Sequence, residues 1–155
     1  MDRSDAAAVI AFAGKPDASR VGSEPGNLPY RALGYGCAAK RTGSLMRTVR
    51  GGPACQTVFF LDRRTGKLET FYTASPDYAD GHGVRVGMTQ AEAERRVHAR
   101  VTIGCNAALH FEGPKASLSI GFGGGVENGT ALTGAHVDAL VLHSKRRDAG
   151  VFDCL

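Results

Sequence analysis

Two aspartates and a histidine lie close together in one predicted loop. Asp77, Asp80 and His82 all fall within Pro76–Gly83. Carboxylate oxygens and imidazole nitrogens are common metal ligands, and loops carry functional residues more often than cores do. The spacing matches no calcium-binding loop, however, and aspartate and glycine are also the usual turn formers. The pattern favours a turn and leaves a metal site as the alternative.

Three further histidines fall on predicted strands: His110, His136 and His143. Neighbouring strands could bring two of them together as ligands or as acid–base groups. No nucleophile or carboxylate stands at a defined spacing from them. A lone histidine on a strand is more often a surface or hydrogen-bonded residue, so this polar site is the second candidate.

No recognised catalytic motif accompanies these residues. The glycine-rich segments Gly34–Cys37 and Gly121–Gly125 lack the Lys-Ser/Thr pair of a phosphate-binding loop. No Gly-x-Ser-x-Gly nucleophile elbow occurs. The sequence therefore predicts no catalytic residue and no cofactor.

The four cysteines favour disulfides over structural zinc, because there is no Cys-x-x-Cys pair and no histidine at zinc-finger spacing. Four cysteines allow three connectivities. We favour two bridges, Cys37–Cys55 and Cys105–Cys154, the second fastening the tail near the end of the chain. Four buried free thiols in a cytosolic protein are the alternative.

Disulfides persist in oxidising compartments, so the cysteines predict a secreted or cell-envelope protein. The first residues, Met1–Ser4, have no signal-peptide pattern, and a leader removed before this sequence begins would reconcile the two observations. No apolar run is long enough for a membrane span.

The elements of the first half are a helix followed by strands. Ser4 is the expected N-cap of a helix over Ser4–Ala13 that buries Val9, Phe12 and Ala13, and Gly14 with Pro16 ends it. Residues 17–30 are expected to form a loop. Strands are expected at Arg31–Ala38, Ser44–Arg50, Thr57–Asp62 and Lys67–Ala74, the last two joined by a hairpin turn with Gly66 in the left-handed region.

The second half repeats that order. Thr89 and Glu92 form a predicted capping box, and Glu92 can also pair with Arg96 one turn on. Strands are expected at Val101–Cys105, Ala107–Glu112, Ala116–Phe122 and His136–Ser144, with a glycine-rich loop over Gly123–Gly134. We expect an α+β fold in which two short helices pack on one face of an antiparallel sheet. The chain, 1–155, is expected to be one domain, with possible pseudo-repeated halves 1–78 and 79–155.

Composition argues against a nucleic-acid binder. The net charge of +4 comes from 19 basic and 15 acidic side chains scattered along the chain. Nucleic-acid binders concentrate basic residues on one face with aromatic residues nearby. The densest basic groups, Arg63-Arg64 and Lys145-Arg146-Arg147, are expected to be solvated turns, so a solvated basic surface is the better interpretation.

The segment Gly83–Ala93, which contains Gly-Met-Thr before a Gln- and Glu-rich helix, is similar to a helix opening in small exported bacterial modules. It resembles the β-lactamase inhibitory protein family and the outer-membrane small-lipoprotein (SmpA/OmlA) modules. Phe12–Asp17 resembles the Gly-x-Pro-Asp end of the helical part of such modules. The resemblance implies helices on one face of an antiparallel sheet in an exported binding protein, and it carries over no functional residue.

The sequence therefore predicts an exported, disulfide-bonded, non-catalytic binding module that presents an open sheet face and glycine-rich loops. Its partner is an unknown protein or small ligand, with no nucleic acid and no membrane span, and its oligomeric state is open. The alternative is a small secreted enzyme or ligand-pocket protein that uses histidine and aspartate side chains.

Overall fold

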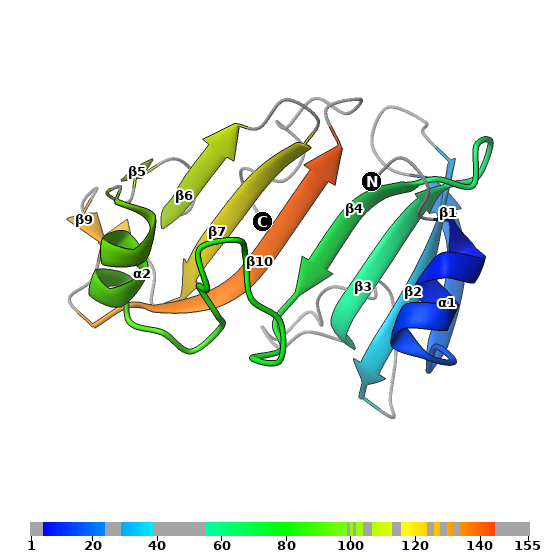
Figure 1. Ribbon diagram of the computed structural model, residues 1–155, viewed down its shortest axis with the longest axis horizontal. Helices are drawn as coiled ribbons and strands as arrows, with labels where there is room; N and C mark the ends of the chain where they lie inside the picture. The colour runs from blue at the N-terminus through cyan, green and yellow to red at the C-terminus, as the bar shows by residue number, and fades with distance from the viewer. Residues whose placement is uncertain are drawn as a thin grey trace. The chain divides into compact units, whose positions relative to one another are not determined.

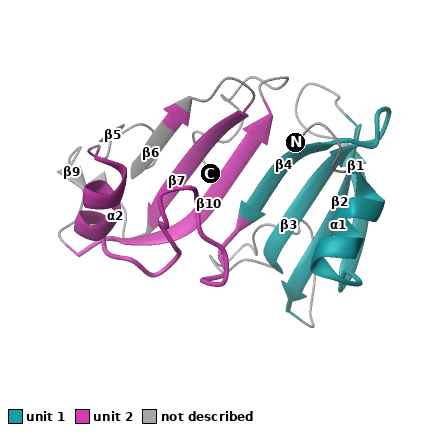
Figure 2. Cartoon of the chain, in the orientation of Figure 1, with its two compact units in different colours: residues 1–72 teal, residues 73–155 magenta. Residues whose placement is uncertain are grey.

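The computed structural model describes residues 5–23, 29–38, 55–98, 100, 102–103, 107–112, 116–123, 126–127, 130–131 and 134–144. It has the predicted α+β composition, with helices and antiparallel strands (Figure 1). The chain divides into two compact units, residues 1–72 and residues 73–155 (Figure 2). Among the described residues, no helix is long and apolar enough to cross a membrane.

The first unit places one helix beside four strands. Its strand order is β1-β2-β3-β4, and β2 pairs antiparallel with both β1 and β3. The strand β1 is therefore an edge strand of this unit. The elements are α1 (Ala6–Ala13), β1 (Ala18–Ser23), β2 (Pro29–Cys37), β3 (Cys55–Asp62) and β4 (Leu68–Thr73).

The helix α1 is capped one residue later than the sequence predicted. Asp5 is the N-cap, and its Oδ1 accepts a hydrogen bond of 2.9 Å from the amide of Ala8. An aspartate at this position satisfies an amide that the first helical turn leaves free, as the predicted Ser4 would have done. Gly14 ends the helix with φ 80°, as predicted, and its amide donates to the carbonyl of Ile10.

The first unit buries side chains on both faces of its sheet. On the α1 face, Val9 packs against a cluster of strand residues (Leu33, Phe59, Leu61 and Leu68). On the other face, Val58 and Phe60 pack with Ala18, Ala32 and the predicted disulfide between Cys37 and Cys55, which is confirmed. The hairpin between β3 and β4 is also confirmed, with Gly66 at φ 70°.

The second unit also places one helix beside antiparallel strands. Its main strand order is β10-β7-β6-β5, and a separate two-stranded ladder joins β8 to β9. The elements are α2 (Gln90–Val97), β5 (Thr102–Ile103), β6 (Ala107–Glu112), β7 (Ala116–Gly123), β8 (Val126–Glu127), β9 (Thr130–Ala131) and β10 (His136–Ser144).

The start of α2 is fixed both by its cap and by β10. Thr89 and Glu92 form the predicted capping box, and His98 ends the helix in the left-handed region at φ 52°. The amide of Val137 donates to the carbonyl of Met88, and the amide of Gln90 donates to the carbonyl of Ala135. The Glu92 carboxylate accepts from the amide and hydroxyl of Thr89, and the structure shows no ion pair between Glu92 and Arg96, which are both described residues.

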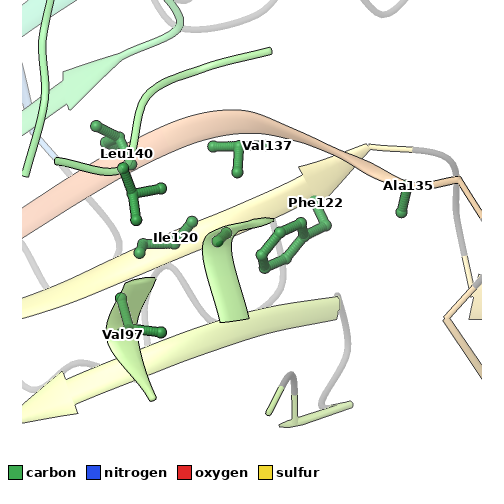
Figure 3. Close-up of a cluster of buried hydrophobic side chains, with 8 residues drawn as sticks. Val97, Ile120, Phe122, Ala135, Val137 and Leu140 are labelled. Atoms are coloured by element: carbon green, nitrogen blue, oxygen red, sulfur yellow. The ribbon is translucent and has the colours of Figure 1, made fainter. Parts of the chain in front are cut away.

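The core of the second unit lies between α2 and the sheet (Figure 3). Ala93 and Val97 of α2 pack against Ile120 and Phe122 of β7 and Val137 of β10. Leu118 contacts the same cluster, so the predicted inward set of β7 (Leu118, Ile120 and Phe122) is confirmed. This packing makes α2 the helical layer of the second unit.

Two expected loops contain strands. Residues 17–30 include β1 and the start of β2, and Gly123–Gly134 includes β8 and β9. Among the described side chains of β1, only Ala18 packs into a cluster, which fits the absence of an alternating apolar pattern in this strand. Within Gly123–Gly134, the Asn128-Gly129 dipeptide is typical of a hairpin turn, but the high glycine content of the segment favoured a loop prediction.

Some predictions concern residues that the structure does not describe. The proposed Cys105–Cys154 bridge and the strand Ser44–Arg50 lie outside the described residues. One disulfide of the predicted two is therefore seen. The pseudo-repeat of halves 1–78 and 79–155 stays a prediction.

Candidate functional site

Asp80 and His82 form a hydrogen-bonded pair in the loop before α2. The side chain of Asp80 is 1% exposed, while that of His82 is 49% exposed. Oδ1 of Asp80 accepts from the amides of His82 (2.8 Å) and Val84 (2.7 Å), and its Oδ2 lies 3.3 Å from Nδ1 of His82. The buried carboxylate thus fixes both the loop backbone and the imidazole.

The imidazole of His82 also contacts an aromatic ring. Its centroid lies 5.7 Å from that of Phe111 on β6. When Nδ1 carries the proton and donates to Asp80, Nε2 is left as an acceptor. Such a pair can act as a base or present one nitrogen to a ligand.

Asp77 takes no part in that pair. Its Oδ2 accepts a hydrogen bond of 2.9 Å from Oγ of Ser75, and its backbone carbonyl accepts from Arg85. Over the described residues, no group of three or more histidine, cysteine, aspartate or glutamate side chains could hold a metal ion. The structure therefore brings together two of the three residues of the sequence-predicted metal site.

The three strand histidines are spread over the second unit. His110 lies on β6 opposite Ser119, and His143 lies on β10 opposite Ser117, so that β7 separates the two histidines. His143 is buried, at 2% exposure. His136 is the exposed first residue of β10 and bridges to Thr89. None of the three therefore occupies a strand position directly beside another.

A surface that the sequence did not predict lies on the first unit. Three large apolar side chains are exposed among the described residues: Ile10 (39%), Phe12 (74%) and Val21 (54%). Ile10 and Phe12 belong to α1, and Val21 belongs to the edge strand β1. The prediction that Phe12 lies inward is wrong.

Val21 lies on the same side of the sheet as α1. It pairs with Arg31 on β2, and residues directly opposite one another share a face. Leu33 and Tyr35 are two and four residues beyond Arg31, so they share its face of β2, and both pack in the cluster that contains Val9 of α1. We use the name α1/β1 surface for the solvent-facing sides of α1 and β1, which carry Ile10 and Phe12 on different flanks of the helix and Val21 on the strand.

The composition of α1 explains this surface. All eight residues of the helix are apolar, yet Val9 alone among them is buried. A helix that is apolar on every side is normally covered on every side. The sequence feature that could have predicted the exposed apolar side chains is the absence of any polar residue from Ala6 to Ala13. A search for a single apolar stripe does not detect this feature.

Comparisons with known proteins identify no family for this chain. No family model matches the chain, and no curated protein matches it. Among solved structures, the chain is similar to an extracellular protein containing an SCP domain from Bacillus anthracis str. Ames, with 10% sequence identity and a TM-score of 0.46. The match covers 91% of this chain and 43% of that protein, so the chain spans less than half the length of that neighbour.

Proposed function

We propose that the protein is an exported, disulfide-bonded, non-catalytic binding module that contacts its partner through the α1/β1 surface. The observation that carries the proposal is the exposure of Phe12 on a wholly apolar helix. Large exposed apolar side chains are candidate sites of interaction, and aromatic residues are prominent among binding hot spots.

The location of this surface differs from the open sheet face expected from the sequence. In the first unit, both faces of the sheet carry buried clusters. In the second unit, Ser117, Val141 and His143 lie on the sheet face away from α2 and are also buried. The α1/β1 surface is the better candidate, since its large apolar side chains face solvent.

Export is supported by the Cys37–Cys55 disulfide. A structural disulfide persists in secreted and cell-envelope proteins and is rare in a reducing cytosol. The residues of this bridge pair directly across β2 and β3, within a buried cluster. The proposed compartment is therefore extracellular or in the cell envelope. The resemblance to the β-lactamase inhibitory protein and small-lipoprotein modules stays a prediction.

Site-specific photo-crosslinking in the producing cells tests the proposal. A photoreactive phenylalanine analogue at position 12 should yield a crosslinked partner, while the same analogue at Arg95, an exposed site on α2, should not. The isolated partner should then bind the wild-type chain and bind the Phe12→Ser variant at least about tenfold more weakly. Equal crosslinking at both positions, or at neither, would contradict the proposal.

The alternative is a small secreted enzyme or ligand-pocket protein, and the Asp80–His82 pair favours it. A buried carboxylate beside a half-exposed imidazole is an arrangement that orients catalytic histidines. A His82→Asn variant would test this function, because it removes the basic nitrogen while keeping a polar side chain. Loss of an identified activity with an unchanged free energy of unfolding would support the alternative.

A further inference from the structure

The edge strand β1 has unused backbone hydrogen-bonding groups. In the described part of the chain, β1 pairs with β2 alone. Alternate amides and carbonyls of an edge strand point away from its neighbour and can accept another strand. Proline and lysine, which often block such edges, are both absent from Ala18–Ser23.

An arginine flanks this edge on each face of the sheet. Arg31 lies on the α1 face, and its Nε donates a hydrogen bond of 3.3 Å to Oγ of Ser19, which holds the side chain toward β1. Arg20 lies on the opposite face, because it alternates with Val21 along the strand. Both arginines are exposed, and within the described ranges neither forms an ion pair.

These charges decide between two possible occupants of the edge. If a second copy of the chain paired through β1, it would bring two further arginines to the same short edge, in a chain that already carries +4. Like charges that face each other across strands are destabilising. An acidic segment would instead place carboxylates beside both guanidinium groups.

We infer that β1 binds an extended, acidic segment of a partner protein, which adds to the sheet as a further strand. The inference rests on the proposed binding function and names the class and pose of the partner. The backbone of the segment pairs with β1, and one apolar side chain opposite Val21 covers that residue on the α1 side. Acidic side chains opposite Ser19 and Arg20 reach Arg31 and Arg20, one on each face.

The register gives the partner a short pattern. In antiparallel pairing, the residues opposite Val21, Arg20 and Ser19 are consecutive, so the segment reads apolar-acidic-acidic. Side chains alternate between the two faces, which places the apolar residue and the second acidic residue together on the α1 side. The first acidic residue then lies on the other face with Arg20.

The test uses the full chain and two synthetic peptides with blocked ends. One is Ser-Val-Glu-Glu-Val-Thr, and the matched control is Ser-Val-Lys-Lys-Val-Thr. Amide chemical shifts of the chain are followed by NMR during each titration. We expect the glutamate peptide to shift amides of Ala18–Ser23 and to bind about tenfold more tightly than the lysine peptide at low salt. The preference should shrink in about 0.5 M salt, where charges are screened.

A charge-reversed variant sharpens the result. Arg20→Glu combined with Arg31→Glu should make the lysine peptide the tighter ligand. Arg95→Glu combined with Arg100→Glu makes the same change in net charge at two other exposed arginines and should keep the original preference. The two-peptide comparison on the wild-type chain decides the matter even if a variant fails to fold.

Three results would overturn the inference: equal binding of the two peptides, no shift of β1 amides with either, and concentration-dependent dimerisation through β1. If neither peptide binds but position 12 still crosslinks a partner, strand addition is wrong and the binding function stands. If position 12 crosslinks nothing while the glutamate peptide binds β1, Phe12 is not the anchor of the module.

Discussion

Gly34 leaves room for the sulfur atom of Cys55 because it has no side chain. A methyl group built on Gly34 would lie 2.6 Å from Sγ of Cys55 and 3.0 Å from Sγ of Cys37. The disulfide therefore occupies the space that any larger side chain at position 34 would need, and a strand residue without a side chain is what permits the bridge to pack against β2.

Replacing Gly34 with alanine should destabilise the protein by about 1–3 kcal/mol, because the added methyl group overpacks a buried site. The measurement is the free energy of unfolding in urea. Gly81→Ala is the matched control, since nothing lies within 4 Å of its Cβ position. The cost should fall when Cys37 and Cys55 are both alanine, and an equal cost in that background would refute the steric explanation.

The two predicted disulfides can be counted by alkylation. The unfolded, unreduced chain should leave Cys37 and Cys55 unlabelled by iodoacetamide, because they are bonded. If Cys105–Cys154 also forms, those two cysteines will stay unlabelled as well. Modification of Cys105 and Cys154 alone would show that the second predicted bridge is absent.

Glu92 should make stability depend on pH. Hydrogen bonds from the side chain and the amide of Thr89 lower the pKa of the Glu92 carboxyl, and nearby Arg95 and Arg96 lower it further. Because the pKa of Glu92 is lower in the folded state, its carboxylate stabilises the fold fully at pH values above the unfolded-state pKa of about 4.3. This stabilisation is lost as the pH falls through the folded-state pKa.

Urea denaturation of the wild type and of Glu92→Gln measures this effect. Glutamine keeps the hydrogen-bonding geometry and does not titrate. The stability difference between the two should be constant from about pH 6 to pH 7 and should shrink at acid pH. A difference that is independent of pH would contradict the stated role of the carboxylate.

Asp80→Ala should loosen the loop before α2. The change leaves the exposed amide of His82 and the partly buried amide of Val84 without their acceptor, at a cost of about 1 kcal/mol. Hydrogen exchange at these two amides should accelerate, while exchange in β3 of the other unit should not. Asp77→Ala should cost less. The hydrogen bond described for the side chain of Asp77 is the one it accepts from Ser75.

The sequence predicted elements best where local chemistry and burial agree. The capping box of Thr89 and Glu92, the turn at Gly66 and the bounds of β10 were all predicted correctly, since each depends on neighbouring residues. The Cys37–Cys55 pairing was favoured because it closes a Gly- and Arg-rich loop, and it is confirmed at facing positions of β2 and β3. These features need little information from distant parts of the chain.

The candidate surface was missed because exposure is a tertiary property. A helix composed of apolar residues has no polar face to show which side turns inward, so Phe12 was assigned to the core. The edge strand β1 was missed because its side chains show no alternation. His82 was identified, but its pairing with Asp80 depends on a turn that spacing alone does not define.

The most direct test of the binding function is the affinity of the crosslinked partner for the Phe12→Ser variant, measured by calorimetry beside the free energy of unfolding. Because the side chain of Phe12 is exposed, the free energy of unfolding should change by less than about 0.5 kcal/mol. The affinity should fall at least about tenfold. Unchanged affinity, with or without a loss of stability, would contradict the claim that α1 is a binding surface.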